Sequence, residues 1–272
     1  MPVDILLSTY NGEKYLEEQL DSIVRQTFTS WILLIRDDGS TDHTRGIISK
    51  YCKLYPNKIK EIVDNKGNVG SSLSFSLLLE QSKSEYIMFC DQDDVWLDDK
   101  VEVTYNEMTE LENGNGQLPL MVFTDLFVVD EELNMINNSF MNELKLFPEV
   151  VNNLHKAMAL NVVAGCTIMI NEKAKKHVLP FHKFFIHDYW MTINIIKYGK
   201  CKYLNKQTIL YRQHRNNVYG TFKVNFKYFY KKIIDLYSFI IWSFRLRSKL
   251  SFKFSLFKYI YYKTIISIRR TF

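Results

Sequence analysis

The first ninety residues alternate between short apolar segments and longer segments in which apolar residues recur at helical spacing. The apolar segments are 3–9, 31–36, 59–63 and 86–90, and the helical segments between them are 16–24, 42–55 and 71–81. Repeated strand–helix units predict an α/β fold with a mostly parallel sheet and helices on both faces. Ligands of such sheets bind outside the carboxyl ends of the strands, so functional residues are expected where these strands end.

Three of the predicted strands run directly into polar residues. These polar segments are 8–11, 37–40 and 91–94. Because the carboxyl ends of parallel strands meet at one edge of a sheet, we expect the three segments to converge on a single site.

The segment Asp91-Gln92-Asp93-Asp94 places three carboxylates within four residues, directly after an apolar strand. Carboxylates this close repel one another unless a cation or hydrogen-bond donors compensate their charge. Mg²⁺ and Mn²⁺ prefer oxygen ligands and keep coordination positions open for phosphate oxygens. The alternative is a solvated turn in which Asp98 caps the next helix. Capping needs only one Asp, so a metal site is the preferred interpretation.

The other two strand ends each have a structural and a functional interpretation. Asp37-Asp38-Gly39-Ser40 is typical of a turn, although one carboxylate could accept a hydrogen bond from a nucleobase. Taken alone, this segment favours the turn. Ser8-Thr9-Tyr10-Asn11 either ends a strand before an Asn-Gly turn or presents Tyr10 for stacking on a base.

Two later segments hold further candidates. Asp188, which follows His187 at the start of a predicted helix over 187–198, either caps that helix or acts as a general base if its surroundings raise its pKa. A single histidine such as His214 usually has a structural role, but a neutral imidazole can also join carboxylates around a metal. Arg212 could pair with phosphate or with any carboxylate.

The second half of the chain is more mixed in pattern. A strand is predicted over 120–125, and a strand or buried turn over 162–170 around Gly165. The globular part is expected to end just after the last apolar segment before residue 220. This predicts a catalytic domain over 1–220 and an extension over 221–272. The four cysteines form no C-x-x-C pair and lie in or beside apolar segments, so buried free thiols are expected.

Taken together, these segments resemble the inverting family 2 glycosyltransferases of the GT-A fold. Within that family the resemblance is greatest to the bacterial rhamnosyltransferase-like enzymes that build cell-surface polysaccharides. Each motif is weak alone, but the ordered set is specific and implies a Rossmann-like GT-A catalytic domain. The matching stretches, in chain order, are Ser8-Thr9-Tyr10-Asn11-Gly12, Gln26-Thr27-Phe28, Asp37-Asp38-Gly39-Ser40-Thr41-Asp42, Asn68-Val69-Gly70, Phe89-Cys90-Asp91-Gln92-Asp93-Asp94-Val95-Trp96, Gly165-Cys166-Thr167, His187-Asp188-Tyr189-Trp190, Tyr211-Arg212-Gln213-His214 and Asn216-Asn217-Val218.

The resemblance implies a role for each matching position. The implied contacts to the donor nucleotide are Ser8, Tyr10, Asp38 and Asp91. The implied ligands of Mn²⁺ or Mg²⁺ are Asp93, Asp91 and His214. The implied catalytic base is Asp188. The implied further contacts to diphosphate or acceptor are Asp94, Arg212 and Gly165.

The implied reaction moves a sugar from a nucleotide-diphosphate sugar to a glycan or lipid-linked oligosaccharide acceptor. Asp188 would deprotonate the acceptor hydroxyl, which attacks the anomeric carbon opposite the leaving diphosphate and inverts its configuration. His187 stands where many relatives carry Glu; this points to the rhamnosyltransferase-like branch, with rhamnose as one candidate sugar. The family's processive members carry a Q-x-x-R-W segment and several spanning helices. Neither is found in this sequence, so addition of one sugar is expected.

The extension over 221–272 has a net charge of +11, whereas the first 220 residues have a net charge of −6. Basic residues interleaved with aromatic ones predict contact with an anionic membrane surface. The alternative is a helical pair packed on the catalytic domain or on a second subunit of a homo-oligomer. Nucleic-acid binding is not expected, because the catalytic part is acidic and carries no nucleic-acid motif. With no secretion signal or spanning segment, the expected location is cytoplasmic, peripheral on the inner face of the plasma membrane.

Two other functions compete with sugar transfer. A metal-dependent nucleotidyltransferase would normally have a Gly-rich, Lys- or Arg-bearing phosphate loop after the first strand. Tyr10-Asn11-Gly12-Glu13-Lys14 is a poor match to such a loop. A non-catalytic membrane-surface binding module would have the same fold but no enzymatic turnover. Substitution of the acidic residues distinguishes such a module from an enzyme.

Overall fold

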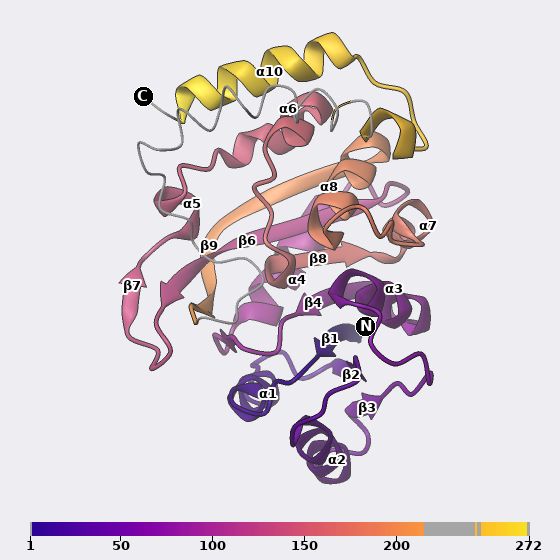
Figure 1. Ribbon diagram of the computed structural model, residues 1–272, viewed down its shortest axis with the longest axis vertical. Helices are drawn as coiled ribbons and strands as arrows, with labels where there is room; N and C mark the ends of the chain where they lie inside the picture. The colour runs from indigo at the N-terminus through magenta and orange to yellow at the C-terminus, as the bar shows by residue number, and fades with distance from the viewer. Residues whose placement is uncertain (1, 215–242, 244–245, 271–272) are drawn as a thin grey trace.

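A computed structural model of the chain describes residues 2–214, 243 and 246–270 (Figure 1). Within these residues one sheet has the strand order β3-β2-β1-β4-β8-β6-β9-β5, and β7 pairs with β6. The strands are β1 (Val3–Thr9), β2 (Trp31–Asp37), β3 (Ile59–Glu61), β4 (Tyr86–Cys90), β5 (Val95–Trp96), β6 (Leu120–Val129), β7 (Met135–Asn137), β8 (Ile168–Asn171) and β9 (Lys200–Arg212). The predicted α/β fold is confirmed.

The N-terminal half of the sheet is parallel, as the alternating pattern predicts. β1 lies between β2 and β4, and its residue Ile5 is opposite Leu33 on one side and Met88 on the other. Ile5 faces the helices α1, α2 and α4, whereas its neighbour Leu6 faces α3 on the other side of the sheet. Helices therefore cover both faces, which explains why these strands are apolar along their whole length.

The helices are α1 (Leu16–Val24), α2 (Thr44–Leu54), α3 (Ser71–Gln81), α4 (Lys100–Glu112), α5 (Phe140–Glu143), α6 (Leu154–Ala159), α7 (Glu172–Val178), α8 (His187–Tyr198) and α10 (Leu256–Arg269). The predictions for 71–81 and 187–198 agree with α3 and α8 at both ends. The first helix of the chain, α1, buries Leu16, Leu20 and Ile23 on one side. Its exposed acidic residues face solvent, so this amphipathic pattern fixes its orientation.

The C-terminal half of the sheet is mixed rather than parallel. β8 runs antiparallel to both β4 and β6, while β6 and β9 are parallel to each other. The segment predicted over 162–170 as a strand or buried turn contains both: a 3₁₀ turn at Gly165–Thr167 leads into β8. The four cysteines are free thiols, and three of them are buried, as predicted.

The described part of the extension packs on the rest of the chain. α10 lies along α6 (Figure 1), and its residues Tyr259 and Ile266 join the same hydrophobic core as α8. This is the packing on the catalytic domain that the sequence left open as an alternative. Residues 216–218 and the basic stretch 226–232 lie outside the described residues, as do all residues of 236–244 except Ser243. Among the described helices, none has the length and apolar character that crossing a bilayer requires.

Candidate active site

The loops after β1 and β2 are joined by hydrogen bonds at the carboxyl edge of the sheet. The Asn11 N–H donates to Ser40 Oγ (2.9 Å), and Asn11 Oδ1 accepts from the Thr41 N–H (2.9 Å). The Gly12 N–H donates to Thr44 Oγ1 at the start of α2 (2.8 Å). The predicted convergence of these strand ends is therefore confirmed.

Gln92 joins the acidic loop to the same edge. Its Oε1 accepts from the Tyr10 N–H (2.8 Å) and its Nε2 donates to the Tyr10 carbonyl (3.1 Å). A Cβ at Gly12 would collide with the Gln92 amide, so only glycine leaves room for it. The Tyr10 ring is half exposed beside this contact. Sequence reasoning did not single out Gln92, although an amide between two acids was a usable signal.

Asp38 and Arg36 form a buried ion pair behind the carboxyl edge of the sheet. The Arg36 guanidinium lies 2.5 Å from Asp38 Oδ1 and 2.9 Å from Asp64 Oδ2, and the Arg36 and Asp38 side chains are almost completely buried. Asp38 also accepts backbone N–H groups from Val69 (2.9 Å) and Gly70 (2.8 Å). Asp38 thus fixes the 68–70 loop against β2.

The neighbouring side chains at this edge have separate partners. Asp37 accepts from Arg45 and Ser40. Ser8 Oγ donates to Ser74 Oγ (2.7 Å) on α3. Ser8, Tyr10 and the Asp38 loop therefore lie along one edge, as the resemblance predicts for nucleotide contacts.

Asp91 and Asp94 lie close together behind the acidic loop. One ligand atom from each, together with the Cys166 thiol, lies within 4.8 Å of the others. Asp94 is fully buried; its Oδ1 accepts the Arg212 N–H (3.1 Å), and its Oδ2 has no hydrogen-bond partner in the described structure. Burial, followed by the charges of Asp93 and Asp91, raises the pKa of Asp94 well above its usual range. Burial and the charges of Asp93 and Asp188 raise the pKa of Asp91 to about 7.

Asp93 and His214 come together from segments far apart in the sequence. His214 Nε2 lies 2.9 Å from Asp93 Oδ2, and the imidazole ring packs on the Tyr15 ring in a tilted arrangement, with 4.9 Å between centroids. β9 brings His214 to this place, because β9 pairs with β5 directly after the acidic loop. The structure thus brings the two implied metal ligands into contact.

Arg212 holds the acidic loop from behind. Its side chain is buried, donates to the Asp93 carbonyl (3.0 Å) and contacts the Glu18 carboxylate and the Glu131 carbonyl. The guanidinium also lies over the Tyr15 ring, 4.6 Å from its centroid. These contacts give Arg212 a positioning role in the described structure.

The donor set suits a hard divalent cation. Asp91, Asp93 and Asp94 supply carboxylate oxygens, and His214 supplies an imidazole nitrogen. Burial, followed by the neighbouring carboxylates, raises the pKa values of Asp91 and Asp94, and Asp94 Oδ2 has no hydrogen-bond partner in the described structure; a bound cation would stabilise the charged forms of both groups. The Cys166 thiol is a poor ligand for such a cation, because burial raises its pKa well above the ordinary value and keeps it protonated.

Asp188 lies near this cluster at the first turn of α8. Asn161 Nδ2 donates to Asp188 Oδ1 (3.1 Å), and Asn161 Oδ1 accepts the Val163 N–H (3.2 Å). Burial raises the pKa of Asp188 to about 7. The carboxylate is therefore oriented by a fixed amide and can exchange a proton near neutral pH. Sequence reasoning missed Asn161, which sits in irregular structure 27 residues before its partner.

Gly165 accommodates the side chain of His187. The imidazole packs against Phe75 (4.6 Å between centroids) and stacks on Phe181, and burial lowers its pKa to about 4. A Cβ at Gly165 would fall well inside contact distance of His187 Nε2. Gly165 thus acts on the site through His187, which is neutral at pH 7 and directly precedes Asp188.

Gly165→Ala should lower the free energy of unfolding by about 1–3 kcal/mol, since the new methyl group must displace buried His187. Gly46→Ala is the control: Gly46 lies in α2 with no neighbouring atom within 4 Å of the position that an added methyl group would take, and alanine favours helices. Urea denaturation of both variants measures the difference. Equal stability of the two would contradict the assigned role of Gly165.

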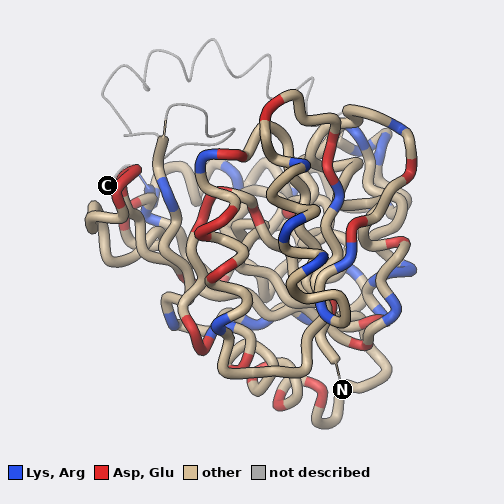
Figure 2. The backbone as a smooth tube through the Cα atoms, turned by 90° about the horizontal axis from the view of Figure 1, so that it is seen from below, with Lys and Arg blue, Asp and Glu red and all other residues tan. Residues whose placement is uncertain are grey.

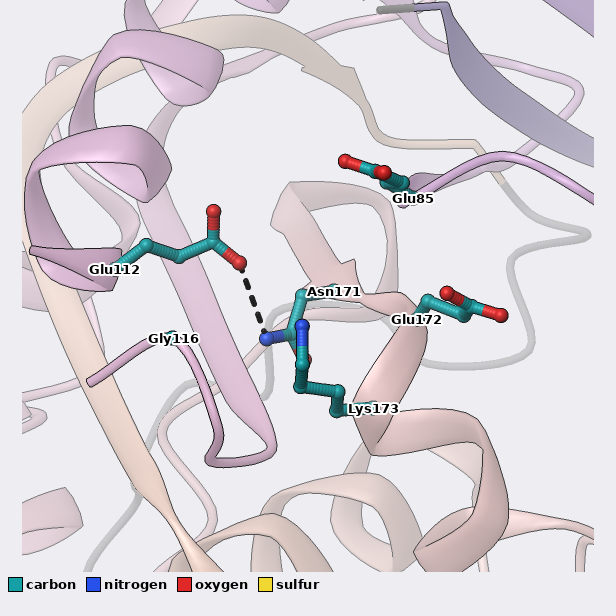
Figure 3. Close-up of a pocket in the computed structure, with 6 residues that line it drawn as sticks. All are labelled: Glu85, Glu112, Gly116, Asn171, Glu172 and Lys173. Atoms are coloured by element: carbon teal, nitrogen blue, oxygen red, sulfur yellow. Dashed lines mark hydrogen bonds between the residues drawn. The ribbon is translucent and has the colours of Figure 1, made fainter.

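A separate small pocket lies at the other end of β4. Its lining residues are Glu85, Glu112, Gly116, Asn171, Glu172 and Lys173 (Figure 3). Asn171 Nδ2 donates to Glu112 Oε1 (3.3 Å) inside it. Glu85 precedes β4, whereas Asp91 follows it, so this pocket is at the opposite edge of the sheet from the strand-end site.

The chain is similar to known glycosyltransferases. The chain is 29% identical over 251 residues to the dTDP-rhamnosyl transferase RfbG of Shigella flexneri, covering 84% of this chain and 78% of that protein. It is 24% identical over 205 residues to the UDP-Glc:alpha-D-GlcNAc-diphosphoundecaprenol beta-1,3-glucosyltransferase WfgD of Escherichia coli, covering 75% and 73%.

Among solved structures, it is similar to the mannosyltransferase PcManGT from Pyrobaculum calidifontis in complex with GDP-Man and Mn²⁺, with TM-score 0.60 and 15% identity over 79% of this chain and 58% of that one. It is also similar to S. aureus TarS 1–349 in complex with UDP-GlcNAc, with TM-score 0.56 and 19% identity over 85% and 64%. These likenesses show the fold. Residues 4–178 match the family described as "Glycosyl transferase family 2". This match spans well over half of the chain, and the chain belongs to that family of enzymes.

Proposed function

We propose that this enzyme moves a sugar from a nucleotide-diphosphate sugar to a glycan or lipid-linked oligosaccharide acceptor in bacterial cell-surface polysaccharide synthesis. The observation that carries this proposal is the meeting of Asp93 with His214 beside Asp91 and Asp94, with Asp188 close by. The first two relatives support the substrate class, since their names describe sugar transfer from dTDP- and UDP-linked donors.

In the proposed reaction, Asp188 takes the proton of the acceptor hydroxyl as that oxygen attacks the anomeric carbon. Asn161 holds the carboxylate in one orientation, and the raised pKa makes it a competent base near neutral pH. The residues that would hold Mn²⁺ or Mg²⁺ are Asp91, Asp93 and His214, with Asp94 behind them. The chemistry that the cation supplies when bound is stabilisation of negative charge on the leaving diphosphate. Displacement in one step inverts the anomeric configuration.

The proposed nucleotide contacts are Ser8, Tyr10, Asp38 and Asp91. Tyr10 suits this role because its ring is half exposed while its backbone is fixed by Gln92. Asp38 would act chiefly by holding its loop, since its oxygens already accept three donors. Rhamnose is the proposed sugar because of the similarity to RfbG.

Metal dependence tests the proposal. Asp93→Ala should lower nucleoside diphosphate release roughly 100-fold or more, and excess EDTA should abolish it until Mn²⁺ or Mg²⁺ is restored. Asp98→Ala is the control, because the Asp98 side chain is 64% exposed and lies outside the cluster. Full activity of Asp93→Ala in EDTA would refute the metal site.

Peripheral association with the cytoplasmic face of the plasma membrane is also proposed. It is supported by the charge of +11 over 221–272 and by an acceptor that would be carried on lipid. The alternative role proposed for the same extension is contact with a second subunit in a homo-oligomer.

A further inference from the structure

α10 has apolar residues on two opposite sides. Its inner side buries Tyr259 and Ile266 against the domain. Its outer side exposes Phe257 (80%), Tyr261 (52%), Ile265 (41%) and Ile268 (54%), which we call the outer stripe. At 3.6 residues per turn these four lie within roughly a quarter of the helix circumference. A helix held only by the core would carry polar residues there.

Contacts in the middle and at the C-terminal end of α10 hold the outer stripe in place. Lys263 Nζ donates to the Ala159 carbonyl at the end of α6 (2.7 Å). Arg269 pairs with Glu149 (2.8 Å) and lies 3.7 Å from the centroid of the Phe147 ring. These contacts and the buried Tyr259 fix the rotation of the helix, so the outer stripe faces away from the domain.

The segment that carries the outer stripe has charges of one sign. Acidic and basic positions are mixed over the described backbone as a whole (Figure 2). Residues 246–270 contain seven Lys or Arg and no acid. Five of these cations are exposed within or before α10: Arg247, Lys249, Lys253, Lys258 and Arg269. A second copy seated on the same stripe would bring like charges together, whereas an anionic surface would neutralise them.

We propose that the outer stripe inserts into the interface of an anionic lipid bilayer, with the surrounding Lys and Arg at the headgroups. Exposed apolar residues flanked by cations are what an interfacial helix requires. The contact would also place the membrane near the acceptor side of the enzyme. Lys263 touches Ala159, and Asn161, two residues later, holds Asp188. The insertion of the outer stripe deepens the peripheral membrane association proposed above, and the position of the membrane beside the acceptor rests on the proposed sugar transfer.

The test is co-sedimentation of the full chain with vesicles of phosphatidylglycerol and phosphatidylcholine, and with phosphatidylcholine alone. The triple variant Phe257→Gln, Tyr261→Gln, Ile265→Gln should lose roughly tenfold or more in partition to anionic vesicles. The control is Leu54→Gln, Val63→Gln, Ile136→Gln, which removes equally exposed apolar residues (61%, 72% and 55%) elsewhere. This control should bind as the unchanged chain does.

Donor hydrolysis separates this inference from the proposed function. The outer-stripe variant should hydrolyse soluble nucleotide sugar at the unchanged rate and melt at the unchanged temperature, since its substitutions are on the surface. Unchanged vesicle binding by the outer-stripe variant would overturn the proposal, as would absence of binding by the unchanged chain. Loss of a dimer in light scattering, without loss of vesicle binding, would assign the stripe to a second copy and also overturn it.

Discussion

Asp188→Asn should lower the rate of sugar transfer roughly 100- to 10,000-fold, the contribution of a general base. The amide keeps an oxygen for Asn161 Nδ2 but cannot accept the proton of the acceptor hydroxyl. In the unchanged enzyme the rate should fall about tenfold for each pH unit below 7, because the pKa of Asp188 is about 7. Steady-state rates between pH 5 and pH 9 measure both effects.

The same substitution should stabilise the fold at pH 8. The pKa of Asp188 is raised from 3.8 to about 7 in the folded state, so the folded state binds this proton more tightly. The contribution of Asp188 to the free energy of unfolding is therefore highest at low pH and decreases as the pH rises from about 4 to about 7. The full pKa shift would change the free energy of unfolding by about 4 kcal/mol between low and high pH. The actual change should be smaller, because the Asp188 side chain keeps some contact with solvent.

Melting temperatures in EDTA therefore provide a second measurement on Asp188→Asn. The variant should melt several degrees higher than the unchanged chain at pH 8 and show no advantage at pH 4. Lower stability of the variant at pH 8 would contradict the burial of this charge. Retained transfer activity would contradict its role as the base.

Arg36→Met should lower the free energy of unfolding by about 3–5 kcal/mol. Methionine fills similar volume but leaves the buried Asp38 carboxylate without its counter-charge and removes the contact to Asp64. Urea denaturation followed by circular dichroism measures the loss.

Arg45→Met is the matched control for Arg36. Arg45 also pairs with an aspartate, Asp37, at 2.8 Å, but its side chain is 64% exposed. The Asp37 side chain is buried, but it keeps its hydrogen bonds from Ser40 when Arg45 is replaced, and solvent screens the exposed guanidinium, so the loss should be smaller, about 1 kcal/mol. Equal losses in the two variants would show that burial of the Arg36–Asp38 pair is not what stabilises this edge.

The parallel half of the fold was predictable because each strand there is buried on both faces and each helix on one. β1 and α3, for example, agree with the sequence pattern at both ends. β8 was not predictable in the same way. Its four residues are all buried, so their sequence carries no periodic signal that distinguishes an antiparallel strand from a buried turn.

The residue types of the site were also predictable, but their partners were not. Asp93 meets His214 only because β5 pairs with β9, and Asn161 reaches Asp188 from an irregular segment. Such contacts depend on tertiary structure rather than local sequence. The Arg36–Asp38 pair is different, because Arg36 lies two residues before Asp38. Side chains two residues apart on a strand point to the same side, so the sequence could have predicted this ion pair.

The packing of α10 on α6 was the alternative that composition favoured less than contact with a membrane surface. Basic and aromatic residues suit both a membrane surface and a helix interface. In the described residues α10 has both: a buried inner side and an exposed outer stripe.

The most direct test of the central claim identifies which phosphate product the chain releases. The full chain is incubated with Mn²⁺ or Mg²⁺ and either labelled nucleotide sugars or nucleoside triphosphates with sugar 1-phosphates. We predict that nucleoside diphosphate is released from a nucleotide sugar, and that Asp93→Ala and Asp188→Asn each lower this release roughly 100-fold or more. Pyrophosphate released from a nucleoside triphosphate, or full transfer by both variants, would contradict it.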